Sequence, residues 1–185
     1  MKTPWIFSVI IGLCVGCSSY RIVRNEVDKT ANWSSYRTFA FIDTNRIEPT
    51  PNETYRTAMD QLKQAVAAEL TNRGYQQITT AQTGTHPDLL VNIGGIINEK
   101  TQTRPTTIYE APRYIGQRRY HWQSQDVPVG TYKEGTVNIH IVDTRRNELL
   151  WDAAVSSVLR KGNVTPDQIR DGVSQLFTKF PGKAS

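Results

Sequence analysis

The side chains that could carry out catalysis are few, and their spacing does not match a known catalytic arrangement. The three histidines, His86, His121 and His140, are not spaced as metal ligands. The sequence holds no G-x-S-x-G nucleophile motif, no H-E-x-x-H metal-binding helix and no phosphate-binding P-loop. We therefore predict no catalytic residue, no metal site and no cofactor.

Two residues keep a hydrolase of cell-wall or lipid material open as the alternative. An acid or base such as Asp143 or His140, in the strand predicted over 135–143, could serve such an enzyme. Acid–base pairs can also assemble from distant residues. An aspartate that ends a strand is more often a turn former, however, and His140 falls on the polar face of its strand. An enzyme is therefore the less favoured interpretation.

A second group of side chains is suited to binding. Residues 100–130 combine arginines with aromatic residues and are interrupted by prolines. Loops of this length are usually functional or disordered, and mobile loops are usually poor in large aromatics. Tyrosine and arginine are enriched at interfaces. We predict a contact surface here, with a mobile basic loop as the alternative. The candidate binding residues are Tyr109, Arg113, Tyr114, Arg118, Arg119, Tyr120 and Trp122.

Both cysteines, Cys14 and Cys17, lie near the amino terminus. The folded part of the chain therefore has no disulfide, no cysteine nucleophile and no thiolate zinc site. Lys2 precedes an apolar run over residues 5–15, which has the length of a signal-peptide core. This run is shorter than the roughly 20 residues that a membrane-spanning helix needs.

The residues Val15-Gly16-Cys17 resemble the lipobox of bacterial lipoproteins, in which two small residues precede an invariant cysteine. We expect residues 1–16 to form a signal peptide, Cys17 to be acylated with chains such as palmitate, and residues 17–23 to form a lipidated tether. Several acyl chains anchor stably, whereas a single chain binds a membrane only marginally. An ordinary signal peptide cleaved nearby, or an uncleaved anchor, is the alternative. Ser18 stands where an aspartate would favour the inner membrane, so the outer membrane is expected.

The charge balance indicates what kinds of partner to expect. A net charge of +5 and a pI near 9.3 favour anionic partners. A secreted envelope protein rarely meets nucleic acid, so nucleic acid is not expected. Besides the membrane, the expected partners are an envelope protein or an anionic glycan.

Strand patterns recur along the chain. Alternating apolar residues predict strands over 37–42, 75–78, 88–93, 135–143 and 149–155. The last two, joined by a polar turn at 144–147, predict a hairpin in which Leu149, Trp151 and Val155 point inward. Gly94-Gly95 interrupts the third strand and predicts a bulge or a close backbone approach.

Two helices are predicted from their caps and periodicity. Capping boxes begin at Thr50 and Thr165, each followed by proline at the first helical position. The first helix should bury Tyr55, Met59, Leu62, Val66 and Leu70 and end at Arg73-Gly74. The second should bury Ile169, Val173, Leu176, Phe177 and Phe180.

Several blocks together resemble one family. They are residues 32–41 (NWSSYRTFAF), 68–75 (AELTNRGY), 87–92 (PDLLVN), 132–143 with Leu150-Trp151, and 176–181 (LFTKFP). The chain resembles the bacterial lipoproteins catalogued as domain of unknown function four-one-three-six, with Trp33 in place of the usual phenylalanine. The resemblance covers nearly the whole mature chain. It implies an envelope location and an α+β fold, and it supplies no catalytic residues.

The combined expectation is one α+β domain over residues 24–182. It should consist of a mixed, mainly antiparallel sheet of five or six strands with two helices packed on one face and the other face partly exposed. The favoured function is a non-catalytic binding or assembly module, anchored at the outer membrane, for an envelope protein or glycan. A purely structural envelope lipoprotein is a third possibility.

Overall fold

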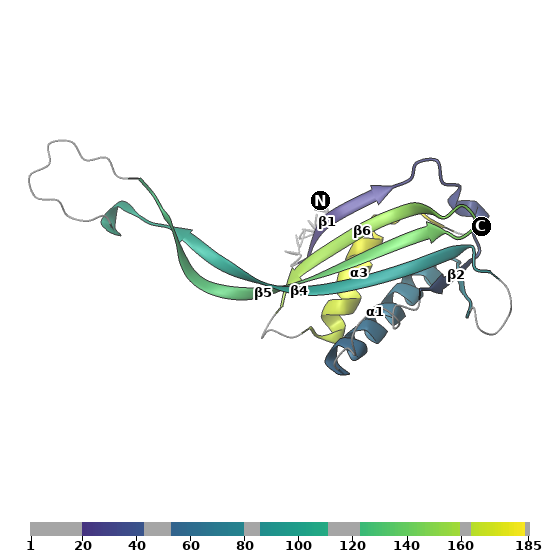
Figure 1. The fold of residues 1–185 in the computed structure, drawn as a ribbon, viewed down its shortest axis with the longest axis horizontal. Coiled ribbons are helices and arrows are strands. Elements are labelled where there is room, and N and C mark those ends of the chain that lie inside the picture. Colours follow the sequence, from purple (N-terminus) through teal and green to yellow (C-terminus); the bar gives the residue numbers. More distant parts are fainter. Residues whose placement is uncertain (1–19, 43–52, 80–85, 111–122, 160–163, 184–185) are drawn as a thin grey trace, which may run out of the picture.

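Six strands form one mixed sheet in the order β1-β6-β5-β4-β2-β3 (Figure 1). The computed structural model describes residues 20–42, 53–79, 86–110, 123–159 and 164–183. The strands are β1 (Tyr20–Val27), β2 (Thr38–Phe41), β3 (Gln76–Gln77), β4 (Leu89–Pro105), β5 (Asp126–Asp143) and β6 (Glu148–Val158). Neighbours from β1 to β4 are antiparallel, whereas β2 runs parallel to both β4 and β3. The predicted mixed, mainly antiparallel sheet is confirmed.

Two helices, α1 (Glu53–Asn72) and α3 (Pro166–Phe177), cover one face of the sheet (Figure 1). The buried face of α1 consists of Met59, Leu62, Val66 and Leu70, as predicted. Tyr55, expected on that face, is 40% exposed instead. The α+β fold with two helices on one face is therefore confirmed.

The helix ends follow the predicted capping devices where the structure describes them. The Thr165 side chain accepts the backbone N–H of Gln168, and the Gln168 side chain accepts the N–H of Thr165, which completes the capping box of α3. Gly74 follows α1 with a φ of 93°, a conformation that costs glycine little. The capping residues predicted for α1, 50–52, lie outside the described residues.

An aromatic cluster joins the sheet to α3. The Trp151 ring is fully buried, with ring centroids 5.2 Å from Phe177 and 4.9 Å from Phe180. Its indole N–H donates to Asn25 Oδ1 on β1 at 2.9 Å, so the polar atom of this large side chain is satisfied. The predicted inward position of Trp151 is confirmed.

The inward position predicted for Leu149 is wrong. Ile141 pairs with Trp151, but the next residue, Val142, pairs with Leu149, so Leu150 is an extra residue in β6. This bulge reverses the alternation of side chains between Trp151 and Leu149. Leu150 is fully buried as a result, and Leu149 is 50% exposed.

The interruption predicted at Gly94-Gly95 is also absent. Gly94 and Gly95 pair in register with Asn138 and Val137, and the shift in the β4–β5 ladder falls between Gln102 and Thr103. A Cβ on Gly95 would lie 3.9 Å from Met59 Sδ, an ordinary contact distance. Neither a bulge nor a close approach therefore accounts for these glycines.

Two boundaries differ from those expected. β1 begins at Tyr20, so Tyr20–Val23, assigned to the tether, are strand residues in the structure. β4 and β5 extend through Pro105 and from Asp126, so much of the segment expected as a loop over 100–130 is a hairpin. These strand residues are mostly exposed on both faces and so lack the alternation that reveals a half-buried strand. Among the described residues, no helix is long and apolar enough to cross a membrane.

We expect Trp151→Ala to lower the free energy of unfolding by about 3–5 kcal/mol, because it empties a fully buried aromatic position. Leu149→Ala, on the same strand but half exposed, should lower it by less than about 1 kcal/mol. Chemical denaturation of both variants measures the difference. Equal losses would contradict the bulged register of β6.

Candidate functional site

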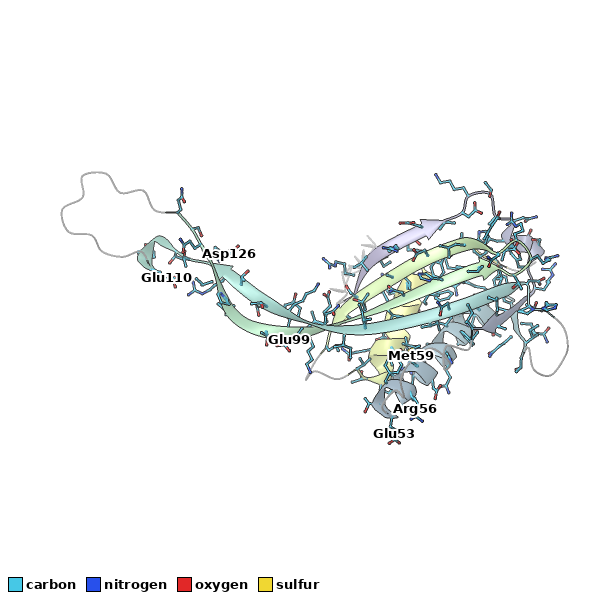
Figure 2. The ribbon with its side chains drawn as sticks, viewed as in Figure 1. Glu53, Arg56, Met59, Glu99, Glu110 and Asp126 are labelled. Carbon is cyan, nitrogen blue, oxygen red and sulfur yellow. The ribbon has the colours of Figure 1, made fainter. Side chains whose placement is uncertain are left out.

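A two-stranded arm projects from the body of the domain (Figures 1 and 2). β6 pairs with β5 only as far as Glu134, whereas β4 continues to pair with β5 out to Asp126. We define the arm as residues 99–110 and 123–133. Its seven residues of β4, from Glu99 to Pro105, extend about 20 Å at roughly 3.3 Å per residue. Figure 2 shows Glu99, Glu110 and Asp126 along this arm, well away from the helices.

Backbone pairing and local polar contacts order the arm. The N–H of Thr106 donates to the carbonyl of Gln125 at 2.8 Å, and the N–H of Gln125 donates to Thr106 Oγ1 at 3.0 Å. The 3₁₀ helix η3 (Ile108–Glu110) follows, and its Glu110 forms a two-point ion pair with Arg104. The hydrogen bonds from Arg104 and from the backbone of Thr107 lower the pKa of Glu110 to about 2.

Ion pairs also fix the base of the arm. Glu134 on β5 pairs with Lys100 on β4 and lies 3.9 Å from the guanidinium of Arg21 on β1. The Lys100 ammonium holds the pKa of Glu134 below its usual range, which outweighs burial. Glu134 is only 9% exposed, so this contact is partly shielded from solvent where the arm leaves the sheet.

The predicted binding residues fall mainly outside the described part of the chain. Tyr109 lies in η3 at the outer end of the arm, with 95% of its surface exposed. The other six, within residues 111–122, and the predicted lipidation residue Cys17 lie outside the described residues: Arg113, Tyr114, Arg118, Arg119, Tyr120 and Trp122. Segment 111–122 follows η3 directly in the chain, so the arm carries the predicted binding segment.

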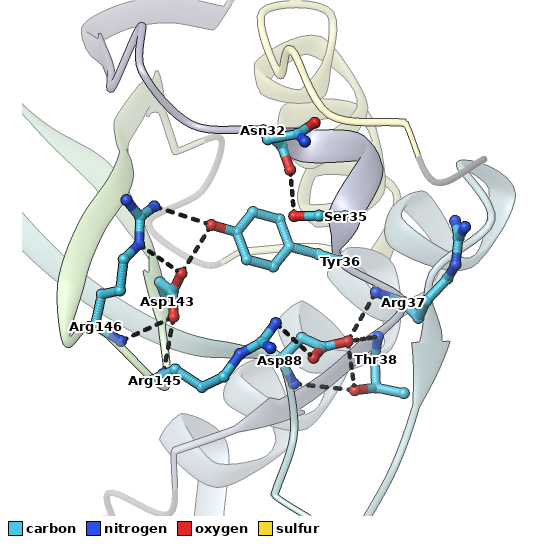
Figure 3. A network of polar contacts seen from close by, with 9 residues as sticks. All are labelled: Asn32, Ser35, Tyr36, Arg37, Thr38, Asp88, Asp143, Arg145 and Arg146. Carbon is cyan, nitrogen blue, oxygen red and sulfur yellow. Dashed lines mark hydrogen bonds and ion pairs between the residues drawn. The ribbon is translucent and has the colours of Figure 1, made fainter.

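At the opposite end of β5, a polar network surrounds Asp143 (Figure 3). Asp143 Oδ1 accepts the backbone N–H groups of Arg145 at 2.8 Å and Arg146 at 3.0 Å. Asp143 Oδ2 accepts the hydroxyl of Tyr36 at 2.8 Å and Nε of Arg146 at 2.9 Å. The same guanidinium donates to the Tyr36 hydroxyl at 3.1 Å. The sequence did not reveal this network, because Tyr36 lies more than a hundred residues before Asp143 and Arg146 in the chain.

The protonation of Asp143 follows from these contacts. Burial by itself would raise the pKa of Asp143, but the hydrogen bonds from Arg146, Tyr36 and Arg145 outweigh it and lower the pKa to about 2. Both oxygens accept two hydrogen bonds each. An ionised, fully hydrogen-bonded carboxylate is a poor general acid and a poor nucleophile. Asp143 therefore acts as the turn former that the sequence favoured.

A second aspartate, Asp88, fastens β2 to the start of β4 (Figure 3). Its Oδ2 accepts the backbone N–H groups of Arg37 and Thr38 at 2.9 and 3.1 Å, and its own N–H donates to Thr38 Oγ1 at 3.0 Å. Arg145 approaches Asp88 Oδ1 at 3.4 Å. The two carboxylates thus hold the same end of the sheet.

The surface beside this network is hollowed. An open depression of about 360 Å³ is lined by Thr30, Asn32, Ser35, Tyr36, Asp143, Arg145 and Arg146. Several of its polar groups are already engaged in the protein: Ser35 donates to the Asn32 carbonyl at 2.7 Å, and Thr30 donates to Asp28. Its polar groups therefore stabilise the loop after β1 and the β5–β6 turn.

The two candidate acid or base residues, His140 and Asp143, do not meet. The two residues are three positions apart on β5, so their side chains leave opposite faces of the sheet. On the face without helices, His140 Nε2 lies 3.2 Å from Asp152 Oδ1, and Arg24 donates to Asp152 Oδ2 at 2.9 Å. Asp152 is thereby buried beneath polar neighbours on this face.

Within the described ranges, no three histidine, cysteine, aspartate or glutamate side chains are grouped closely enough to hold a metal ion. Of the other two histidines, His86 is among the residues covered by this statement, whereas His121 lies outside the described residues.

Comparison with known proteins establishes the family. Residues 23–182 match the family model described as Domain of unknown function (DUF4136), and the chain belongs to this family. No curated protein matches the sequence.

Solved structures show the same fold at low identity. One is a PDZ domain protein from Parabacteroides distasonis, with a TM-score of 0.54 and 16% identity over 90% of this chain. The match spans only 36% of that protein. Another is a PelC dodecamer from Paraburkholderia phytofirmans, with a TM-score of 0.47 and 8% identity, covering 89% of this chain and 99% of the other. The first likeness supports the fold alone, and the second is too distant to carry an argument.

The low pKa of Asp143 makes stability depend on pH. Because its pKa falls from the ordinary 3.8 to about 2 in the folded protein, the carboxylate stabilises the fold above pH 4, and this contribution is lost as the pH falls toward 2. We expect the unfolding free energy of the wild type to drop over this range and that of Asp143→Asn to start lower and drop less. Denaturation at a series of pH values measures both. Parallel pH profiles would show that another carboxylate dominates.

Proposed function

We propose that this chain is a lipid-anchored envelope protein of the outer membrane that acts as a non-catalytic binding or assembly module. Its arm presents the segment after η3 to an envelope protein or an anionic glycan. The projecting arm is the observation that carries this proposal (Figure 2).

The energetics of the arm argue for a binding role. Ordering a backbone residue costs roughly 1–2 kcal/mol, and an isolated two-stranded ribbon is marginally stable at best. Tyr109, Val129 and most other arm residues are exposed, so the arm buries little apolar surface within the chain. A structure that adds so little to the core is better explained by contacts made outside it.

Charge and residue type indicate the partner. The segment beyond η3 contains Arg113, Arg118 and Arg119 among aromatic residues, and the nearest acids are Glu110 and Asp126. Glu110 is already paired with Arg104. The basic side chains of the segment therefore favour an acidic protein surface or an anionic glycan.

The position of the expected anchor is compatible with this role. Tyr20 pairs with Ser157, Ser157 with Gly135, and Gly135 with Ile97, so β1 begins at the end of the sheet from which the arm departs. Cys17 is three residues earlier, and three residues span at most about 10 Å. Acylation at Cys17 would hold the base of the arm close to the membrane surface.

A hydrolase finds less support. Asp143 is ionised and fully hydrogen-bonded, and His140 lies on the opposite face of the sheet. A purely structural lipoprotein would retain its envelope contacts after changes in segment 111–122, which separates it from the proposal.

Acylation can be tested with a fatty-acid analogue in growing cells. We expect the wild type and Cys14→Ser to be labelled and Cys17→Ser to remain unlabelled, because Cys17 follows two small residues and Cys14 follows Leu13. Gel fluorescence of the captured protein measures the label. Equal labelling of Cys17→Ser and wild type would overturn the proposed anchor.

The binding role can be tested by crosslinking the tagged full chain in intact cells and identifying what is captured. Arg118→Ala with Arg119→Ala should weaken capture without lowering the melting temperature, and raised salt should weaken it further, since exposed charges are screened beyond about 8–10 Å. A matched control replaces Lys29 and Lys179 with alanine, which removes two exposed charges from the body. Unchanged capture after both the substitutions and deletion of 111–122 would contradict the proposal.

A further inference from the structure

The sheet has several open strand edges in its described part, among them β1, β3, the part of β4 beyond β2 and the part of β5 before Glu134, and they differ in how they are protected. β3 is only two residues long. β1 has a register shift between Ile22 and Arg24 and places three charges along its length, at Arg21, Arg24 and Glu26. Short strands, bulges and charges are the devices by which proteins discourage pairing between sheet edges.

The edge of β4 lacks these devices over much of its length. β2 pairs with β4 only along Leu89–Val91, so from residue 92 onward β4 has a neighbour on one side only, among the residues that the structure describes. Residues 92–98 (NIGGIIN) contain no charge and no proline, and the ladder shows no register shift until Gln102. This edge is long, regular and open.

The same stretch exposes apolar side chains. Ile96 is 54% exposed and Ile97 is 57% exposed, one on each face of the sheet because they are adjacent in a strand. A Cβ on Gly94 would meet nothing within 4 Å, so the backbone there is accessible. An edge whose peptide groups have no strand partner among the described residues, flanked by two exposed isoleucines, is suited to receiving another strand.

We propose that the occupant of this edge is a second copy of the chain, paired antiparallel through β4 about a two-fold axis at Ile97. Identical surfaces that meet around a two-fold axis are the commonest way in which soluble proteins self-associate. The free stretch is limited on one side by β2, whose pairing with β4 ends at Val91, and on the other by the register shift after Gln102. Ile97 lies midway between these limits, so Asn92 of one copy would pair with Gln102 of the other.

The positions of the charged residues are compatible with this register. With Ile97 at the axis, Glu99 lies opposite Gly95 of the other copy, and Lys100 lies opposite Gly94. No like charges then face each other, and each glycine leaves room for a long side chain. A pairing centred on Glu99 or Lys100 would place that charge directly against its own copy, which is destabilising. The two glycines, which the fold itself does not require, acquire a reason in this arrangement.

Single cysteines test the register directly. In the full chain with Cys14→Ser and Cys17→Ser, purified in detergent, Ile97→Cys should form a disulfide-linked dimer on mild oxidation. Opposed residues in antiparallel strands have Cα atoms about 4.5–5.5 Å apart, within the range that a disulfide spans. Val23→Cys, 47% exposed on the opposite edge strand β1, is the matched control and should form no disulfide-linked dimer. Linkage through Val23 and not Ile97 would overturn the proposal.

Charge substitutions test whether the association exists without a covalent link. Ile97→Lys and Ile97→Glu should each raise the dissociation constant of the dimer by about tenfold or more, because like charges meet at the axis and apolar contact is lost. An equimolar mixture of the two should dimerise again. Val129→Lys is a similar substitution at a residue of the arm that is 49% exposed, and it should leave the association unchanged. Sedimentation velocity measures all four samples.

The outcomes separate this inference from the proposed binding role. A wild-type chain that stays monomeric at every concentration overturns self-pairing, as does a chain whose Ile97→Cys links only to a different envelope protein. Arg118→Ala with Arg119→Ala should leave the dimer intact, because those residues lie beyond the paired stretch. Loss of partner capture with an intact dimer, or the reverse, therefore identifies which of the two proposals fails.

Discussion

The uninterrupted antiparallel ladder between β4 and β5 is the interaction on which the rest of the structure depends. Every residue of β4 from Leu89 to Pro105 has a partner on β5. The first part of the ladder lies at the centre of the sheet and carries the buried face on which the helices pack. The last part leaves the body and forms the arm. Since the register is continuous from Leu89 to Gln102, the packing of the core also fixes the pairing at the base of the exposed ribbon.

The two ends of this ladder are stabilised by different physics. At the turn end, Asp143 is buried and accepts four hydrogen bonds, and Asp88 fastens β2 beside it. These contacts are largely shielded from water, where hydrogen bonds to a charged group are worth more than at the surface. At the arm end, the ion pairs of Glu110 and Arg104 are partly exposed, so solvent screens them and backbone pairing dominates. The buried polar residues therefore belong to the fold, and the groups free to meet another molecule lie along the arm and its edge.

The difference between the two ends of the ladder accounts for two features of the chain. The sequence contains no known catalytic motif, and the segment carried by the arm is rich in residue types that are common at interfaces. The most perturbed carboxylate, Asp143, owes its low pKa to hydrogen bonds that close a turn. The exposed apolar residues Ile96, Ile97 and Val129 lie near or along the arm. Where titratable groups serve the core and apolar groups face solvent, the geometry favours association over chemistry.

Much of the architecture could be derived from the sequence because its signals are local. Periodicity placed the buried faces of α1 and α3 and the inward position of Trp151, and the capping pattern at Thr165 marked where α3 begins. The pattern of cysteines and the apolar leader led to the expected anchor at Cys17. Each of these conclusions depends on residues within a few turns of helix or a few strand positions.

Only the tertiary structure decided the rest, because the responsible contacts join distant residues. The bulge at Leu150 arises in the pairing of β6 with β5 and reverses the position of Leu149, which no single-strand pattern reveals. The arm escaped the sequence pattern because a ribbon exposed on both faces has no alternation to detect. One partner of Asp143, the hydroxyl of Tyr36, comes from a segment more than a hundred residues earlier in the chain. Sequence alone thus determined the faces of the elements, whereas strand pairing determined which faces, edges and carboxylates remain available to another molecule.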